Sequence, residues 1–285
     1  MIVPHVRRWG STRVLADRDL LPVQDLLNLH PVVNVMVTAR VEAAGLDPWR
    51  LGAEVWGYPA SGEPHAICFS GANLVPVGGD AEALDAFADR ARRQGRRCSS
   101  IVGDAEQVLG LWALLEDHWG PARDVRPDQP LMSIEGPPAV TAHPDVRLVR
   151  PEELELFLPA AIAMYTEEIG FSPVGADGGS LYRARVAELI NDRRAFAWIE
   201  NGEVRFKAEI GAAAGDTCQI QGVWVDPAYR GQGLGESGTA AVVVAAQAKI
   251  AQVVSLYVNA HNTPARRAYE RVGFEVVGSF ASVLF

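Results

Sequence analysis

The stretch that decides the fold is Val223-Trp224-Val225-Asp226-Pro227-Ala228-Tyr229-Arg230-Gly231-Gln232-Gly233-Leu234-Gly235. Apolar residues up to Val225 predict a strand, and the glycines after it predict a turn that leads into a helix. Glycine lets the backbone come close to a ligand, while a helix N-terminus offers unpaired N–H groups and the positive end of a dipole. The stretch therefore predicts an anion site, and a pyrophosphate is the ligand that suits it.

Two common nucleotide motifs do not fit this stretch. The Rossmann pattern G-x-G-x-x-G, counted from Gly231, requires a glycine where Glu236 stands. A P-loop requires Gly-Lys followed by Ser or Thr, and the sequence lacks it. The glycine cluster must therefore serve another ligand, or be a plain helix-capping turn.

Two signatures occur in order along the second half of the chain. Arg230-x-x-Gly233-x-Gly235 matches the coenzyme A signature Q/R-x-x-G-x-G/A of the GCN5-related N-acetyltransferases (GNAT). Residues 262–274 resemble that family's second signature, N-x-x-A-x-x-x-Y-x-x-x-G-F; they read Asn262-Thr263-Pro264-Ala265-Arg266-Arg267-Ala268-Tyr269-Glu270-Arg271-Val272-Gly273-Phe274. Over residues 146–285 the chain is identified as a member of this family.

The resemblance implies acetyl-CoA as co-substrate and gives the coenzyme-binding residues. Backbone groups of Val223 and Val225 should meet the pantetheine arm, and the N–H groups from Gly231 to Glu236 should hold the pyrophosphate. Glu236 suits a helix start, but beside phosphates it must turn outward. Asn262 should hydrogen-bond the coenzyme near its pantetheine. The expected set is Val223, Trp224, Val225, Arg230, Gly231, Gln232, Gly233, Leu234, Gly235, Glu236, Asn262 and Tyr269.

The chemistry implied by the resemblance is direct acyl transfer to a primary amine. Tyr269 stands at the family's general-acid position, where a phenol can protonate the leaving thiolate. Its alternative role is to pack the helix against the sheet. An N–H on the strand, that of Val225, would stabilise the tetrahedral oxyanion. Arg266 or Arg267 could pair with a phosphate, or be solvated helix charges.

The proton acceptor is less well defined by the sequence. Glu209 is the best-placed carboxylate for a general base, and its alternative role is an ion pair with Lys207 or Arg205 across the sheet. Water relayed through Gln221 is an equal candidate. Two more carboxylates, Glu167 and Glu168, follow Tyr165 near the expected substrate loop, where they are either solvated or amine-binding.

Composition limits the classes of function. The chain has 285 residues, 48% of them hydrophobic, and a net charge of −9. This favours a globular core, and the acidic balance removes the basic footprint that nucleic-acid binding needs. The longest apolar run, Ala240 to Ala246, is too short to span a membrane, and Met1 to Arg8 has no signal-peptide pattern.

The three cysteines predict neither a zinc site nor a disulfide framework. Cys68, Cys98 and Cys218 are too far apart for either, which favours a reducing compartment, so we expect a cytoplasmic protein. No cluster of His, Asp or Glu supports a metal, and direct transfer needs none. His261 precedes Asn262, but we expect it to be a loop residue without a role.

The sequence predicts two domains and an α/β (α+β) fold with a mixed, mostly antiparallel sheet. Residues 126–145 are proline-rich and read as a connector, of which Leu131 to Ile134 could pair as an edge strand. Residues 146–285 form the catalytic GNAT domain, with a hairpin at Asn201-Gly202 and a closing pair of strands within 274–285.

The first half, residues 1–125, repeats the same order of helices and strands weakly. We predict a degenerate GNAT-like domain, whose strand order should then equal that of the second half; an unrelated α/β domain is the alternative. Its loop Val77-Gly78-Gly79-Asp80 lacks the coenzyme signature, so we expect no coenzyme site there. This domain would shape the acceptor cleft or form a homodimer.

Three functional alternatives follow. The main hypothesis is acetyl transfer to an amine, on a small molecule or a peptide. A non-catalytic acyl-CoA sensor is favoured by the lack of an obvious base and opposed by Tyr269. Transfer of a longer acyl group depends on pocket volume.

Overall fold

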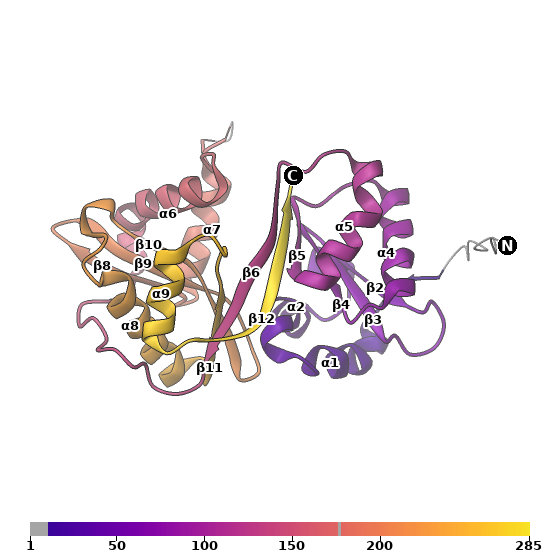
Figure 1. The fold of residues 1–285 in the computed structure, drawn as a ribbon, viewed down its shortest axis with the longest axis horizontal. Helices are drawn as coiled ribbons and strands as arrows, with labels where there is room; N and C mark the ends of the chain where they lie inside the picture. Colours follow the sequence, from indigo (N-terminus) through magenta and orange to yellow (C-terminus); the bar gives the residue numbers. More distant parts are fainter. Residues whose placement is uncertain (1–10, 176–177) are drawn as a thin grey trace. The chain divides into compact units, whose positions relative to one another are not determined.

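A computed structural model describes residues 11–175 and 178–285 (Figure 1). The predicted absence of a signal peptide concerns residues outside these ranges, and so do two residues of the expected loop at 170–179. The described chain divides into two compact units. The first unit runs to Pro130 and includes Gly278–Phe285, while the second unit comprises Leu131–Val277.

The second unit alternates strands and helices around one sheet. Its second and third strands, at 195–200 and 203–214, are joined by the predicted hairpin, where Asn201 and Gly202 both have positive φ (52° and 78°). The elements are β7 (Arg147–Leu148), α6 (Leu154–Ile169), α7 (Ser180–Asn191), β8 (Ala195–Glu200), β9 (Glu203–Ala214), β10 (Thr217–Val225), α8 (Leu234–Lys249), β11 (Val253–Tyr257) and α9 (Thr263–Val272).

The sheet of the second unit is antiparallel except at one place. Its order is β7-β8-β9-β10-β11, and β10 and β11 run parallel. These two strands pair only from Thr217 to Gln219 on β10, although β10 continues to Val225. They therefore separate beyond Gln219, which opens a gap between parallel strands in the middle of the sheet.

The two faces of this sheet differ in chemistry. On β9, Phe206, Ala208 and Ile210 belong to an apolar core together with Val242 and Val243 of α8. Because side chains alternate along a strand, Lys207 and Glu209 lie on the opposite face, which α6 covers. The face that carries polar residues is therefore the one under α6.

The first unit has the strand order of the second. Its strands follow the order β1-β2-β3-β4-β5, antiparallel except for the parallel pair β4–β5, which confirms the predicted repeat. The elements are β1 (Arg13–Val14), α1 (Leu20–Asn28), α2 (Pro31–Ala44), α3 (Pro48–Leu51), β2 (Glu54–Tyr58), β3 (Ala66–Ser70), β4 (Asn73–Val77), α4 (Ala81–Gln94), β5 (Ser100–Asp104) and α5 (Ala105–Trp119).

The last strand of each unit comes from an unexpected part of the sequence. In the first unit β5 pairs with the end of β12 (Glu275–Leu284), through Phe280 to Leu284. In the second unit β11 pairs with the end of β6 (Asp124–Ile134), through Leu131 to Ile134. The units therefore differ in extent from the predicted domains at 1–125 and 146–285, because each takes its last strand from beyond those limits.

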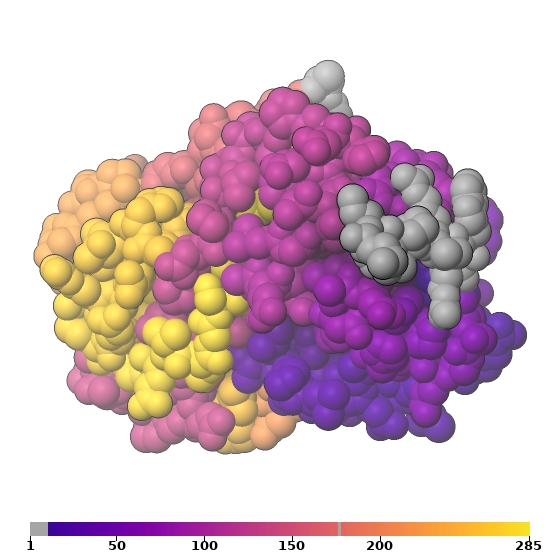
Figure 2. All heavy atoms as spheres, turned by 45° about the vertical axis from the view of Figure 1, so that its right-hand side comes forward, coloured from indigo at the N-terminus to yellow at the C-terminus, as the bar shows by residue number. Residues whose placement is uncertain are grey.

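Two local predictions need correction. The proline-rich segment is a strand up to Ile134, longer than the expected edge strand at 131–134. The closing pair of strands expected within 274–285 is wrong, because Gly278 keeps an extended backbone and β12 continues without a turn. The start of β12 is exposed at Val276 and Val277, and yellow atoms from the last part of the chain lie on the surface in Figure 2.

Candidate active site

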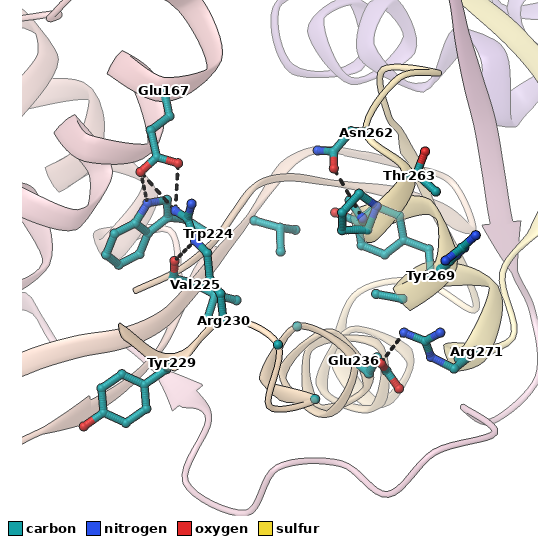
Figure 3. A pocket seen from close by; sticks show the side chains of 18 residues that line it. Glu167, Trp224, Val225, Tyr229, Arg230, Glu236, Asn262, Thr263, Tyr269 and Arg271 are labelled. Atoms are coloured by element: carbon teal, nitrogen blue, oxygen red, sulfur yellow. Dashed lines mark hydrogen bonds and ion pairs between the residues drawn. The ribbon is translucent and has the colours of Figure 1, made fainter. Parts of the chain in front are cut away.

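A cavity of about 670 Å³ lies in the second unit, where β10 and β11 separate (Figure 3). Its walls come from the end of β10, the loop before α8, the first turns of α8 and the helix α9. The lining residues are Glu167, Val223, Trp224, Val225, Tyr229, Arg230, Gly231, Gly233, Gly235, Glu236, Asn262, Thr263, Pro264, Ala265, Arg267, Ala268, Tyr269 and Arg271.

Most of the predicted site residues meet at this cavity. Three predicted residues do not line it. Leu234 is buried in the apolar core, the Gln232 side chain donates to the Ala228 carbonyl oxygen, and Glu209 lies under α6. The first signature therefore supplies the cavity with its arginine and its glycines.

The loop before α8 is shaped by two glycines with positive φ. Gly231 has φ +74° and Gly233 has φ +80°, a region that other residues rarely adopt. The N–H groups of Glu236 and Ser237 already donate to the Gly233 carbonyl oxygen, both at 3.1 Å. The N–H groups that precede Glu236 are therefore the ones a helix N-terminus can offer to an anion.

Two acidic side chains lie on the cavity wall, and each is paired with an arginine. Glu236 accepts from Arg271 at 2.5 Å, so its charge next to the anion site is compensated. Glu167 accepts from Arg230 at 2.8 Å and from the indole N–H of Trp224 at 3.0 Å (Figure 3). The sequence did not indicate either pair, although the misplaced charge of Glu236 was a signal for a nearby cation.

Arg230 is also bound to the strand it follows. Its Nε donates to the carbonyl oxygen of Val225 at 3.0 Å, while its terminal nitrogen binds Glu167. Arg267 lines the cavity too, but it makes no hydrogen bond or ion pair within residues 11–175 and 178–285. Of the two arginines named from the sequence, Arg266 donates to the Ala260 carbonyl oxygen at 3.2 Å, which leaves Arg267 for a phosphate.

Tyr269 is a buried phenol on the cavity wall. Its side chain sits on α9 and is 8% exposed. Burial, and secondarily the negative charge of Glu168, raises the pKa of Tyr269 well above its usual value. The phenol therefore keeps its proton at neutral pH and has it to donate.

Asn262 begins α9. Its side-chain oxygen accepts from the N–H of Ala265 at 3.3 Å, so this residue caps the helix at the edge of the cavity. Its amide nitrogen stays available to a ligand. On the neighbouring loop, Asn259 donates to Glu168 at 3.0 Å, which ties the end of α6 to the end of β11.

Glu209 is ion-paired, as its alternative role predicted. Lys207 Nζ lies 2.5 Å from Glu209 Oε1, and both side chains are buried under α6. Gln221, directly opposite Glu209 on β10, is exposed. Neither residue of the pair lines the cavity, but the pair fills the space beside Gly222 of β10 where a Cβ atom would lie.

The equivalent loop of the first unit is closed by its own side chains. Gln107 Oε1 accepts from the N–H of Gly79 at 2.7 Å, and Gln107 Nε2 donates to the Gly79 carbonyl oxygen at 2.8 Å. Asp80 caps α4 by accepting from Ala83. The backbone group that would meet a phosphate there is therefore already bonded.

Two other kinds of feature are absent from the part of the chain that the structure describes. Outside residues 1–10 and 176–177, no group of three or more His, Cys, Asp or Glu side chains is placed to hold a metal ion. Nor is any helix of the described chain long and apolar enough to cross a membrane.

Two family models match parts of the chain. Residues 173–274 match the model of the Acetyltransferase (GNAT) family, and residues 53–157 match that of a domain of unknown function, DUF4081. No curated protein matches the chain by sequence.

Solved structures share the fold over nearly the whole chain. An acetyltransferase of the GNAT family from Colwellia psychrerythraea has 12% identity and a TM-score of 0.58, covering 96% of this chain and 99% of its own. A GCN5-related N-acetyltransferase from Sphaerobacter thermophilus has 18% identity and a TM-score of 0.57, with coverages of 96% and 95%. A tandem GNAT protein from the clavulanic acid biosynthesis pathway has 14% identity and a TM-score of 0.55, with coverages of 96% and 98%.

The chain therefore consists of two units with the same strand order, it shares the fold of GNAT proteins including a tandem one, and its second unit holds the cavity. The second unit carries a domain of the GNAT acetyltransferase family at residues 173–274.

Proposed function

We propose that the second unit transfers an acetyl group from acetyl-CoA to a primary amine. The observation that carries this proposal is one cavity that joins three features: the separated strand β10, the glycine loop before α8 and the buried phenol of Tyr269. These are an edge for a pantetheine arm, a cradle for a pyrophosphate and a proton donor for a thiolate.

The coenzyme would be held by backbone groups more than by side chains. Val223 and Val225 lie on the part of β10 that has left β11, so their backbone groups are open to the amides of the pantetheine arm. The N–H groups around Gly231 to Gly235 would bind the pyrophosphate, with Arg267 as the nearby cation.

The reaction follows from these positions. A neutral amine attacks the thioester carbonyl, and the N–H of Val225 stabilises the oxyanion that forms. As the intermediate collapses, the carbon–sulfur bond breaks and Tyr269 donates its proton to the departing thiolate. The attacking nitrogen, which is positively charged after the new bond forms, gives its extra proton to the proton acceptor, and a proton returned through water restores the Tyr269 phenol.

The proton acceptor is either Glu209 or water held by Gln221. One oxygen of Glu209 is bound to Lys207, and the carboxylate is 5% exposed, so an amine would reach it only through a relay. Gln221 is exposed at the same position of the sheet. This arrangement favours water at Gln221 as the first acceptor of the proton.

The acceptor, by this proposal, is a primary amine on a small molecule or a peptide. Glu168 at the end of α6, which accepts from the neutral amide of Asn259, would favour a cationic one, whereas the charge of Glu167 is already balanced by Arg230. We infer further that the protein acts in the cytoplasm. A longer acyl chain and a purely sensing role are the alternatives that the following test separates.

The test is the substitution Tyr269→Phe, with Tyr58→Phe in the first unit as the matched control. Coenzyme A binding is measured by calorimetry, and thiol release from acetyl-CoA is measured with a panel of primary amines. A catalyst should lose turnover about 100-fold while the affinity for coenzyme A changes less than about twofold.

Other outcomes assign the alternatives. Binding of acetyl-CoA without turnover of any amine would indicate a sensor. Faster turnover with a longer acyl-CoA would replace the acetyl assignment. If the unsubstituted chain binds neither coenzyme A nor acetyl-CoA, the enzyme assignment is wrong.

A further inference from the structure

A buried lysine in β9 plays no part in the coenzyme cavity. Lys207 is 0% exposed, its Nζ lies 2.5 Å from Glu209 Oε1 and 5.3 Å from the centre of the Phe157 ring. Removing two charges from water costs free energy that two apolar side chains would not cost, so stability alone gives no reason for the pair. Its position suggests another reason.

The pair spans a β-bulge in β10. Glu209 lies opposite Gln221 and Lys207 lies opposite Trp224, so two residues of β10, Gly222 and Val223, face one residue of β9. Gly222 has φ +60°. An extra residue of this kind bends the strand and re-aims the groups that follow it.

The ion pair packs directly against the bulged backbone. A Cβ atom added to Gly222 would lie 3.1 Å from Lys207 Nζ, 3.3 Å from Glu209 Oε2 and 3.1 Å from the terminal methyl of Met164. Both charged groups and Met164 of α6 therefore fill the space beside Gly222 that a side chain would need. A hydrogen-bonded ion pair is directional, so it favours one arrangement of the groups around it more than apolar contacts do.

The residues after the bulge are those that line the cavity. Val223, Trp224 and Val225 follow Gly222 immediately, and the pairing of β10 with β11 has already ended at Gln219. With no neighbour on the β11 side, the direction of their N–H groups depends on β9 and on what supports Gly222. The ion pair fills the space beside Gly222 and so lies where such a support would be.

We propose that Lys207 and Glu209 are positioning residues for acyl transfer: their buried ion pair holds the bulge so that a backbone N–H of Val223 to Val225 points at the thioester carbonyl. This inference rests on the proposed function, because it assumes that an acyl-CoA lies along β10. It also gives Glu209 a role that needs no contact with the amine.

The test uses the full chain and acetyl-CoA labelled with carbon-13 at the thioester carbonyl. A hydrogen bond from the bulge should lower the carbonyl stretching frequency of the bound thioester, which infrared difference spectra measure without any amine. Lys207→Met should lose this shift, while its affinity for coenzyme A changes less than about twofold. Lys249→Met, at the exposed end of α8, is the matched control and should keep the shift.

Two further variants separate positioning from simple loss of structure. Glu209→Gln keeps the shape of the side chain and an oxygen for Lys207, and Gly222→Ala presses a methyl group against the pair; both should reduce the shift in a folded chain. Lys207→Met/Glu209→Met removes both charges but keeps a filled core. It should fold and still lack the shift.

Three results would overturn the inference. An unchanged carbonyl band in Lys207→Met would show that the bulge needs no ion pair. Recovery of the band in the double variant would show that volume alone supports the bulge. Failure of the unsubstituted chain to bind acetyl-CoA would instead remove the coenzyme site itself, and this inference with it.

Discussion

Charged side chains around the cavity are paired with one exception. Glu236 is bound by Arg271 and Glu167 by Arg230, so these four charges cancel. Arg267 is left as an excess positive charge on the wall of a cavity that ends at a helix N-terminus. A cation and a helix dipole at the same place favour a ligand with more than one negative charge, such as a pyrophosphate.

The substitution Arg267→Gln should therefore weaken coenzyme A binding about tenfold, because it removes a charge-assisted hydrogen bond to phosphate. Arg266→Gln removes an equal charge from the same helix, but that side chain binds the Ala260 carbonyl oxygen, so a change of less than about twofold is expected. Calorimetric titration at low and high salt measures both variants. Equal losses in the two would mean that only the overall charge of α9 matters.

The motif residues could be predicted, but their partners could not. The glycines of the loop and Tyr269 each belong to a signature whose own residues are close together in the sequence. Glu167 and Arg230 are 63 positions apart, and Glu236 and Arg271 are 35 apart, so no local spacing joins them. Only the folded arrangement of α6, the loop after β10, α8 and α9 brings these charges together. In that arrangement Glu236 is paired with Arg271, so its negative charge does not oppose an anion.

At the scale of elements, the two units begin with an ion pair at equivalent positions. In the first unit Arg13 donates to Asp19 at 2.7 and 2.8 Å. In the second, Arg147 donates to Glu153 at 2.8 and 2.7 Å. Each carboxylate also accepts the backbone N–H three residues earlier, from Ala16 and from Arg150. The same link between first strand and first helix thus occurs in both units, as a repeat predicts.

Glu153→Gln tests what this link contributes. Hydrogen bonds from Arg147, and then from Arg150, lower the pKa of Glu153 from 4.5 to about 2. Between pH 4.5 and about 2, Glu153 is charged in the folded chain but protonated in the unfolded chain. The ion pair therefore stabilises the fold fully above pH 4.5, and this contribution is lost as the pH falls towards 2.

The variant should lose about 2 kcal/mol of unfolding free energy at pH 7 and should depend less on pH below 4.5. Urea unfolding followed by tryptophan fluorescence at neutral and acidic pH measures this. Glu152→Gln, at an exposed neighbour, is the control and should change little. Acid sensitivity that persists unchanged in Glu153→Gln would assign it to other carboxylates.

Element prediction succeeded where the signal was local and failed where a distant strand decided the outcome. Asn201-Gly202 marks its hairpin because the turn itself needs positive φ. The segment with Pro127 and Pro130 reads as a connector because proline cannot donate to a ladder. It is nevertheless the strand β6, since Leu131 to Ile134 find β11 as a partner. That partner lies more than a hundred residues away.

At the scale of the whole molecule, β6 completes the sheet of the second unit and β12 that of the first, so neither predicted domain is complete by itself. A chain cut at residue 146 would lack Leu131 to Ile134, which complete the sheet of the second unit. A chain ending at residue 125 would lack Phe280 to Leu284, which complete the first. The first unit can therefore close its sheet only after the last residues have been synthesised.

The last strand should accordingly decide the stability of the first unit. Val283 is 0% exposed in the core of that unit, whereas Val276, seven positions earlier on the same strand, is 58% exposed. Val283→Asp buries an unpaired charge and should cost more than about 3 kcal/mol, while Val276→Asp should cost less than about 0.5 kcal/mol.

Hydrogen exchange of the backbone amides of β5, Ser100 to Asp104, provides the measurement, because this strand is the partner of β12. Val283→Asp should speed exchange there and through the core helices α4 and α5, and Val276→Asp should leave it unchanged. Unaltered protection of β5 in Val283→Asp would mean that the first unit holds together without the end of the chain. The first unit would then fold before β12 pairs with β5, and the pairing of β12 would not be needed for its stability.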